Sequence, residues 1–110
     1  MRALIIDPGK APEITTQLPN DEQGIARWLG GPVRMQPFGQ YPAALLYTMR
    51  KSNLIRDCDL PGVPGYTRIW RGSRYYGRLL LIGWRRGKPA SLPKDLAEEL
   101  AREWAAEEVL

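Results

Sequence analysis

The chain has 110 residues, 44% of them hydrophobic and 25% charged, a composition typical of one soluble globular domain with its own core. Its formal charge of +4 favours nucleic acid, nucleotides or acidic proteins as partners over basic proteins. The lack of histidine excludes every histidine-dependent catalytic triad, and the single cysteine excludes an intramolecular disulfide, which fits a reducing cytosol.

The N-terminal third predicts a strand, an extended segment and a short helix. The apolar run Ala3–Ile6 is typical of a buried strand, and Asp7–Lys10 ends it with turn residues. The next segment, Ala11–Leu18, predicts a short edge strand or an extended connector. Asn20 is the expected N-cap of the helix, with Gln23 as the partner in a variant capping box, and the following Gly-Gly-Pro sequence should end it.

The middle of the chain predicts two strands and a long connection. Val33–Phe38 alternates in polarity and predicts a strand that Pro37 weakens. The apolar run Ala43–Met49 predicts a second buried strand. Prolines and glycines then mark Ser52–Gly65 as a long irregular connection, a kind of segment that is often functional in small domains.

The C-terminal half predicts two more strands and a helix. Tyr66–Trp70 is expected to be a short strand, followed by a turn at Gly72. Tyr75–Trp84 should be the longest strand, with a candidate bulge at Gly77 and with Gly87 and Pro89 closing it. A helix is expected from position 92 or 93 to position 108, with an apolar stripe that packs on the sheet and comprises Leu92, Leu96, Leu100 and Trp104.

These elements predict one domain over residues 1–110 with an α+β fold. The expected architecture has two layers, a mostly antiparallel sheet of four to five strands and two helices, in the order β-α-β-β-β-β-α. Only four apolar residues separate Arg2 from Asp7, so we expect no signal peptide or membrane span there. We therefore predict a cytoplasmic protein, in whichever cell makes it.

Residue types that support catalysis are sparse. The aspartates beside Cys58 raise the pKa of its thiol, which disfavours a nucleophilic role. Asp57 and Asp59 suit a solvated turn better than a metal site, and positions 62–65 lack the spacing of a phosphate loop. We expect a protein that is not an enzyme and has neither metal nor cofactor. A pocket lined by Asp57, Asp59 and Tyr66 would favour an enzyme instead.

The stretch from Tyr66 to Lys88 is basic and aromatic, and no acidic residue occurs between Asp59 and Asp95. Tyrosine and tryptophan rings stack on bases, and arginine guanidinium groups pair with phosphate. Strand alternation places Leu79–Ile82 in the core, so the predicted surface lies around the Gly72 turn and the strand ends. The candidate ligand-binding residues are Arg68, Trp70, Arg71, Arg74, Tyr75 and Arg86.

Several segments form a recognisable pattern: an apolar strand with its turn at Asp7–Lys10, Leu60-Pro61 in a loop, the run Tyr76–Gly83, and Ser91-Leu92 before an acidic helix. The pattern resembles the family of small phage and mobile-element proteins called domain of unknown function number thirty-eight forty-six. The resemblance covers most of the chain and is most specific between positions 77 and 92. It implies an accessory protein of a phage, prophage or conjugative element, and it implies no activity.

The chain departs from the pattern of that family in two places. Arg78 stands where the family has proline after the glycine, and Pro93–Asp95 stands where it has Thr-Asp-Glu. The basic and aromatic stretch is therefore expected to be particular to this chain.

Two functions follow from the sequence as hypotheses. The first is a non-enzymatic binding protein, with host defence as one target, that holds nucleic acid or a signalling nucleotide on its basic and aromatic surface. The alternative is a protein-interaction module that inhibits or assembles with a host or phage protein, or forms a homodimer, through its last helix or an exposed sheet edge. A third reading leaves the basic surface solvated, or paired with the acidic last helix, without a specific ligand.

Overall fold

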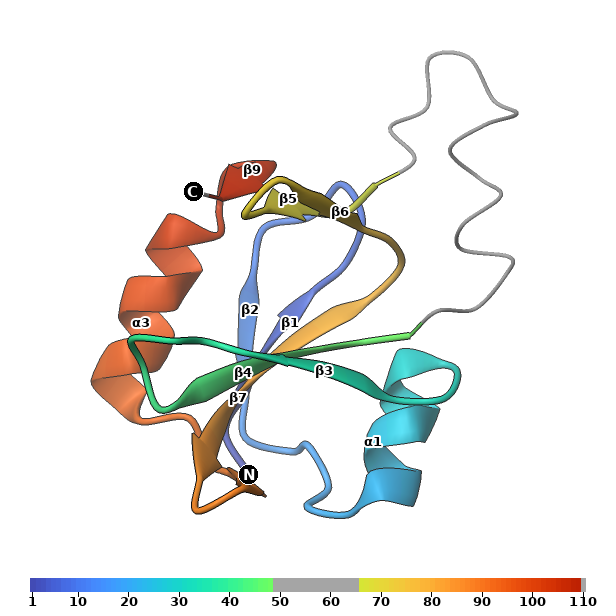
Figure 1. Ribbon diagram of the computed structural model, residues 1–110, viewed down its shortest axis with the longest axis vertical. Coiled ribbons are helices and arrows are strands. Elements are labelled where there is room, and N and C mark those ends of the chain that lie inside the picture. Colours follow the sequence, from blue (N-terminus) through green and yellow to red (C-terminus); the bar gives the residue numbers. More distant parts are fainter. Residues whose placement is uncertain (49–65, 110) are drawn as a thin grey trace.

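The computed structural model describes residues 1–48 and 66–109, and the statements below concern these residues. They form two sheets and two helices (Figure 1). The large sheet contains β1 (Ala3–Ile6), β2 (Glu13–Thr15), β3 (Arg34–Pro37), β4 (Ala43–Tyr47), β7 (Leu79–Arg85) and β8 (Lys88–Ala90). The small sheet contains β5 (Arg68–Trp70), β6 (Ser73–Tyr75) and β9 (Glu108–Val109), and the helices are α1 (Glu22–Leu29) and α3 (Lys94–Glu103).

Strand β7 is the centre of the large sheet, whose strand order is β2-β1-β7-β4-β3 with β8 paired to β7 outside this path. It pairs antiparallel with β1 on one side and with β4 on the other, so that Leu81 lies opposite both Leu4 and Leu45. Because successive side chains of a strand point to opposite faces, β7 contributes to two cores.

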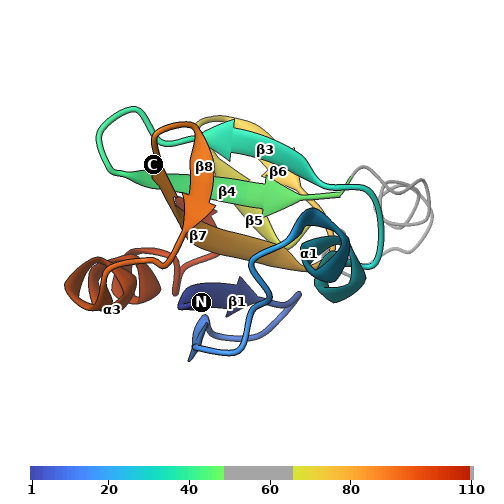
Figure 2. The same cartoon turned by 90° about the horizontal axis from the view of Figure 1, so that it is seen from below.

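One core lies between the large sheet, α3 and the small sheet, and it contains Leu79, Leu81 and Trp104. The other lies between the large sheet and α1, and it contains Leu80 and Ile82. Figure 2 shows the two helices on opposite sides of the central strands. The α+β class and the mostly antiparallel sheet are confirmed, whereas the expected two layers become three because each face of the sheet is covered.

The expected strand Tyr75–Trp84 is wrong as a single element. Its first residue ends β6 in the small sheet, and β7 begins only at Leu79. Gly77 lies between them with a φ of 71°, a left-handed conformation that glycine adopts without strain. The chain therefore changes sheets at the position where the sequence suggested a bulge.

The expected last helix is too long. It ends at Glu103, and residues 108–109 form β9, which pairs in parallel with β5. The backbone N–H of Ile69 donates to the carbonyl of Glu107 at 2.8 Å. Alanine and glutamate favour helix at positions 105–108, so sheet pairing overrides the local preference there.

Other boundaries differ by less. The N-cap of α1 is Asp21 instead of Asn20, and it makes no side-chain capping hydrogen bond, while Gly30 ends the helix with a φ of 83° as expected. Gly87 lies in the turn that ends β7, as expected, whereas Pro89 lies within β8, which follows β7 in a hairpin. The predicted connection 52–65, with the candidate residues Asp57, Cys58 and Asp59, lies outside the described residues.

Two tight hairpins have the same turn sequence, Arg-Gly. Arg71 and Gly72 join β5 to β6 with φ values of 51° and 79°, and Arg86 and Gly87 join β7 to β8 with φ values of 53° and 73°. Positive φ at both central residues is the pattern of a type I′ turn, whose twist matches that of the flanking strands. Each turn holds an exposed arginine at a hairpin tip.

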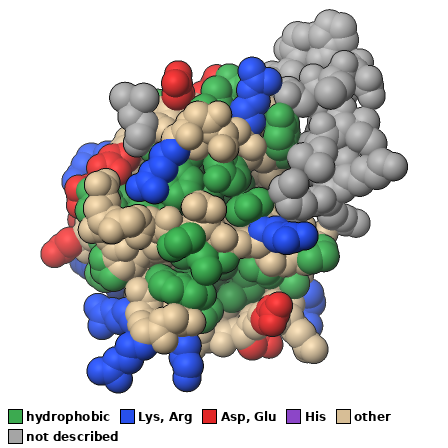
Figure 3. All heavy atoms as spheres, in the orientation of Figure 1, with side chains coloured by type: hydrophobic (Ala, Val, Ile, Leu, Met, Phe, Trp, Pro, Cys, Tyr) green, Lys and Arg blue, Asp and Glu red, His purple; other side chains and the backbone are tan. Residues whose placement is uncertain are grey.

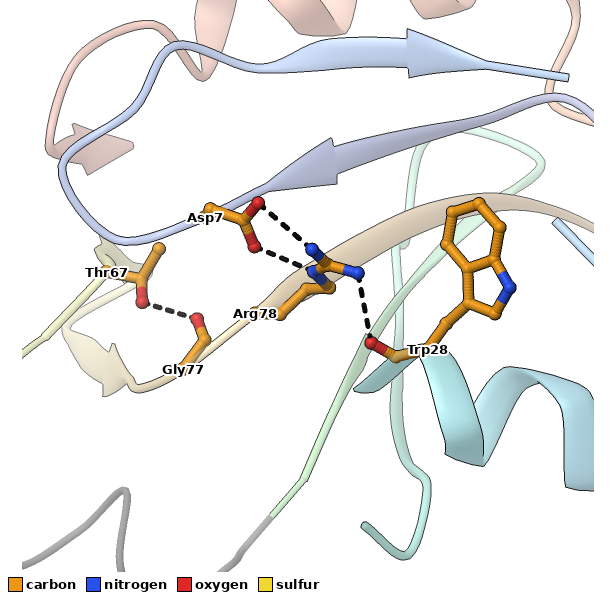
Figure 4. A network of polar contacts seen from close by, with 5 residues as sticks. All are labelled: Asp7, Trp28, Thr67, Gly77 and Arg78. Carbon is orange, nitrogen blue, oxygen red and sulfur yellow. Dashed lines mark hydrogen bonds and ion pairs between the residues drawn. The ribbon is translucent and has the colours of Figure 1, made fainter. Parts of the chain in front are cut away.

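A polar network fixes the start of β7 to its neighbours (Figure 4). Arg78 donates through Nε and Nη2 to the two carboxylate oxygens of Asp7 at 2.7 and 3.2 Å, and through Nη1 to the carbonyl of Trp28 at 3.3 Å. The hydroxyl of Thr67 donates to the carbonyl of Gly77. Arg78 therefore joins the turn after β1 to the C-terminal end of α1.

Neither described helix has the length and apolar character needed to cross a membrane.

A substitution at Gly83 tests how closely β7 packs against the end of β8. A Cβ at this position would collide with the backbone of Ser91 and Ala90, whereas a Cβ at Gly39 would meet nothing within 4 Å. We expect Gly83→Ala to lower the free energy of unfolding by about 2 kcal/mol or more, and Gly39→Ala to change it by less than about 0.5 kcal/mol. Urea denaturation followed by circular dichroism measures both, and equal stability of the two variants would contradict the packing.

Candidate functional site

A cleft of about 310 Å³ lies between the ends of β3 and β4 and the strand β6. Strand β4 belongs to the large sheet and β6 to the small sheet, so the cleft lies where the two sheets meet. The described residues that line it include three tyrosines and an arginine but no acidic residue. They are Gln36, Tyr47, Thr48, Ser73, Arg74, Tyr75 and Tyr76.

Two of the tyrosine rings pack against each other. The ring centroids of Tyr47 and Tyr75 are 5.0 Å apart, and the rings meet edge to face at 78°. Burial raises the pKa of the Tyr75 phenol, the neighbouring Tyr47 raises it further, and the positive charge of Arg71 acts in the opposite direction. Tyr75 is therefore neutral at physiological pH, and the positive potential of Arg71 reaches it.

Two exposed arginines stand near the cleft on the β5–β6 hairpin. The guanidinium carbon of Arg71 lies 4.7 Å from the centroid of the Trp70 ring, and that of Arg74 lies 5.6 Å from the centroid of the Tyr66 ring. These cation–π contacts orient two positive charges beside the tyrosines. The cleft thus combines aromatic surface with a positive potential.

The structure corrects the predicted surface at Arg68 and Trp70, because both side chains are buried with an exposed fraction of 3%. Trp70 stacks on Phe38 with a centroid distance of 4.8 Å and also contacts Trp104 at 5.8 Å. Its aromatic surface belongs to the core and offers little area to a ligand. The aromatic character of the sequence at this position reflects packing between the two sheets.

Arg68 ties three segments together. Its Nε donates to the carbonyl of Trp104 at 2.9 Å, its Nη1 to the carbonyl of Thr67 at 2.6 Å, and its Nη2 to the carbonyl of Lys10 at 2.9 Å. Burial lowers the pKa of the guanidinium, and the charge of Glu107 opposes that effect. Arg68 is therefore a structural residue that joins β5, the turn after β1 and the end of α3.

Arg86 does not lie with the other candidates. It is at the tip of the β7–β8 hairpin, and β7 separates that tip from the cleft by its length of about 20 Å. Figure 1 shows the small sheet and this hairpin at opposite ends of the molecule. Of the six predicted residues, Arg74 and Tyr75 line the cleft, and Arg71 is close enough to lower the pKa of Tyr75.

The sequence did not point to Gln36, Tyr47 or Tyr76 as site residues. Tyr47 follows the apolar residues of β4 and reads as core, and Gln36 is a polar residue of an edge strand. These residues come together only because strands that are distant in sequence lie side by side in the fold. The alternation of residues within one strand does not predict which strands will be neighbours.

Comparisons with protein-family models, curated proteins and solved structures find no match to this chain. The resemblance to a phage and mobile-element family therefore stays a prediction. Among the described residues, no group of three or more acidic, cysteine or histidine side chains is placed to hold a metal ion.

Replacing Arg68 by lysine tests whether its hydrogen bonds, and not only its positive charge, stabilise the fold. Lysine keeps the charge but replaces a planar group with several donors by a single ammonium, which cannot reach all three carbonyls. We expect Arg68→Lys to lower the free energy of unfolding by about 3 kcal/mol, and the exposed Arg71→Lys to leave it within about 0.5 kcal/mol. Thermal and urea denaturation measure both, and a stable Arg68→Lys protein would contradict the assignment.

Proposed function

We propose that this protein is a non-enzymatic accessory protein that binds an anionic ligand carrying an aromatic ring, either a nucleotide or a segment of nucleic acid. The observation that supports the proposal is the tyrosine-lined cleft with Arg74 in its wall, Arg71 beside it and no acidic side chain among the described lining residues. Its setting in the cytoplasm of a cell that carries a phage or mobile element rests on the family resemblance alone.

The chemistry of the cleft suits the two parts of a nucleotide. Tyrosine rings offer faces and edges to a base, and such stacking contributes roughly 1–3 kcal/mol per base in proteins that bind single strands. Ser73 supplies a hydroxyl group and Gln36 an amide group. Each can donate a hydrogen bond to a base or ribose, or accept one from it. The guanidinium groups of Arg71 and Arg74 pair with phosphate.

The size of the cleft limits the ligand. About 310 Å³ is at the lower end of the range for small-molecule sites, so it suits one nucleotide unit. A base that is paired inside a duplex would have to leave its stack to enter. We therefore propose that free nucleotides and single strands bind better than duplexes.

The proposal includes no catalytic step. The lining residues offer phenol, hydroxyl, amide and guanidinium groups, whose ordinary pKa values lie far from neutrality. The pKa of Tyr75 is raised further from the physiological range. Binding is thus the activity that these side chains support.

Charge removal at two places tests where the ligand binds. We expect Arg74→Ala to weaken binding by about 10-fold, since one phosphate contact is lost, and Arg86→Ala to change it by less than about 2-fold, since that residue lies at the far hairpin tip. Fluorescence anisotropy with labelled single-stranded and duplex oligonucleotides, and calorimetry with cyclic nucleotides, measure the affinities at low and moderate salt.

Thermal melts of both variants establish that each is folded before binding is compared. An equal loss in the two variants would indicate general electrostatic attraction instead of the cleft. Failure of the wild-type protein to bind any of these probes at low salt would refute the proposal.

A further inference from the structure

A second hollow, of about 390 Å³, lies on the face of the large sheet that α1 covers. It is separate from the tyrosine cleft, because Leu46 lines the hollow while the next residue, Tyr47, lines the cleft. Most of its lining is apolar. The lining residues are Asn20, Asp21, Glu22, Ile25, Val33, Met35, Leu46, Trp84 and Pro89.

The hollow exists because α1 is too short to cover its face of the sheet. The helix has eight residues and buries Ile25 and Leu29 against the strands. Beyond it, Trp84 is only half-buried, and Met35 has an exposed fraction of 39%. A partly exposed apolar hollow of this kind is a candidate contact surface for another protein.

The two rims of the hollow carry opposite charges. Asp21 and Glu22 are exposed at the start of α1 on one rim. The β7–β8 hairpin forms the other rim with Trp84 and Pro89, and it carries an exposed basic group that comprises Arg85, Arg86 and Lys88. Figure 3 shows this arrangement, with basic side chains at the lower left, acidic side chains at the lower right and hydrophobic side chains between them.

We propose that this face, which we call the dimer face, binds a second copy of the same chain. A twofold interface requires a surface that is complementary to itself. The charges of the dimer face meet that requirement, because an acidic rim and a basic rim lie on opposite sides of its apolar centre. This inference does not depend on the proposed nucleotide site.

The charges fix the direction of the twofold axis. The axis lies in the plane of the dimer face. If it runs between the two rims and parallel to them, it places the basic hairpin of each copy on Asp21 and Glu22 of the other. An axis that runs from one rim to the other would place the basic rim on the basic rim and the acidic rim on the acidic rim. Such contacts between like charges cost several kcal/mol in protein interfaces. In the favoured arrangement the tyrosine cleft lies on the other face of the sheet, so each copy keeps it open.

A charge-swap experiment tests the interface. Sedimentation equilibrium should show that the wild-type chain becomes a dimer as its concentration is raised to about 100 µM. Two double variants each place like charges opposite one another: Asp21→Lys/Glu22→Lys and Arg85→Glu/Arg86→Glu. Each should weaken self-association by at least about 10-fold. An equimolar mixture of the two variants should dimerise again, because both rims are then complementary.

A matched pair of apolar changes tests the centre of the dimer face. Met35 and Ile14 have similar exposed fractions, 39% and 42%, and Ile14 lies on β2 at the opposite edge of the sheet. Met35→Lys should abolish the dimer and Ile14→Lys should leave it intact. Circular dichroism melts establish that the variants are folded.

A monomeric wild-type chain at every concentration would overturn the proposal. So would a mixture of the two charge variants that fails to recover the dimer, or equal effects of Met35→Lys and Ile14→Lys. A wild-type dimer that binds no nucleotide would support the dimer face while refuting the proposed function.

Discussion

The burial of β7 on both of its faces is the constraint on which the rest of the structure depends. Its residues from Leu79 to Ile82 are fully buried, with an exposed fraction of 0% each. A strand of this kind needs apolar cover on two sides, and the chain provides it with α1 on one face and with α3 and the small sheet on the other. At about 25 cal/mol per Å² of buried apolar surface, these side chains are a large part of the driving force for folding.

The same strand separates the two surfaces of interest. At its start, Arg78 fixes the neighbouring turn and helix, and the chain has just left the small sheet that holds Arg74 and Tyr75. At its end, the β7–β8 hairpin carries Arg85 and Arg86 away from the cleft. A buried strand therefore divides the basic stretch of the sequence into the proposed ligand surface and the proposed dimer face. Its arginines serve different purposes, and Arg68 serves neither because it is part of the core.

The sequence predicts the elements whose signal is local. The apolar run Ala3–Ile6 is a strand as expected, β4 covers Ala43–Tyr47 of the expected strand Ala43–Met49, and Gly30 caps the end of α1 as expected. The additional strand β9 could not be predicted, because its pairing with β5 is decided by a partner distant in sequence. The strand β8 pairs with the adjacent β7 in a hairpin, and the glycine and proline there predict only the end of the preceding strand. Two of the residues that line the cleft, Arg74 and Tyr75, are among the ligand-binding residues that the sequence predicts. Its other wall and the burial of Arg68 depend on carbonyls and side chains that only the tertiary fold brings near.

The central claim is that the cleft between the two sheets binds a nucleotide. The most direct measurement is a nuclear magnetic resonance titration of the wild-type protein with a mononucleotide, in which the ring protons of the tyrosines are assigned. The account predicts that shifts concentrate on Tyr47, Tyr75 and Tyr76, with no change at Trp84. Shifts that concentrate on Trp84 and the β7–β8 hairpin, or no shifts at all, would contradict it.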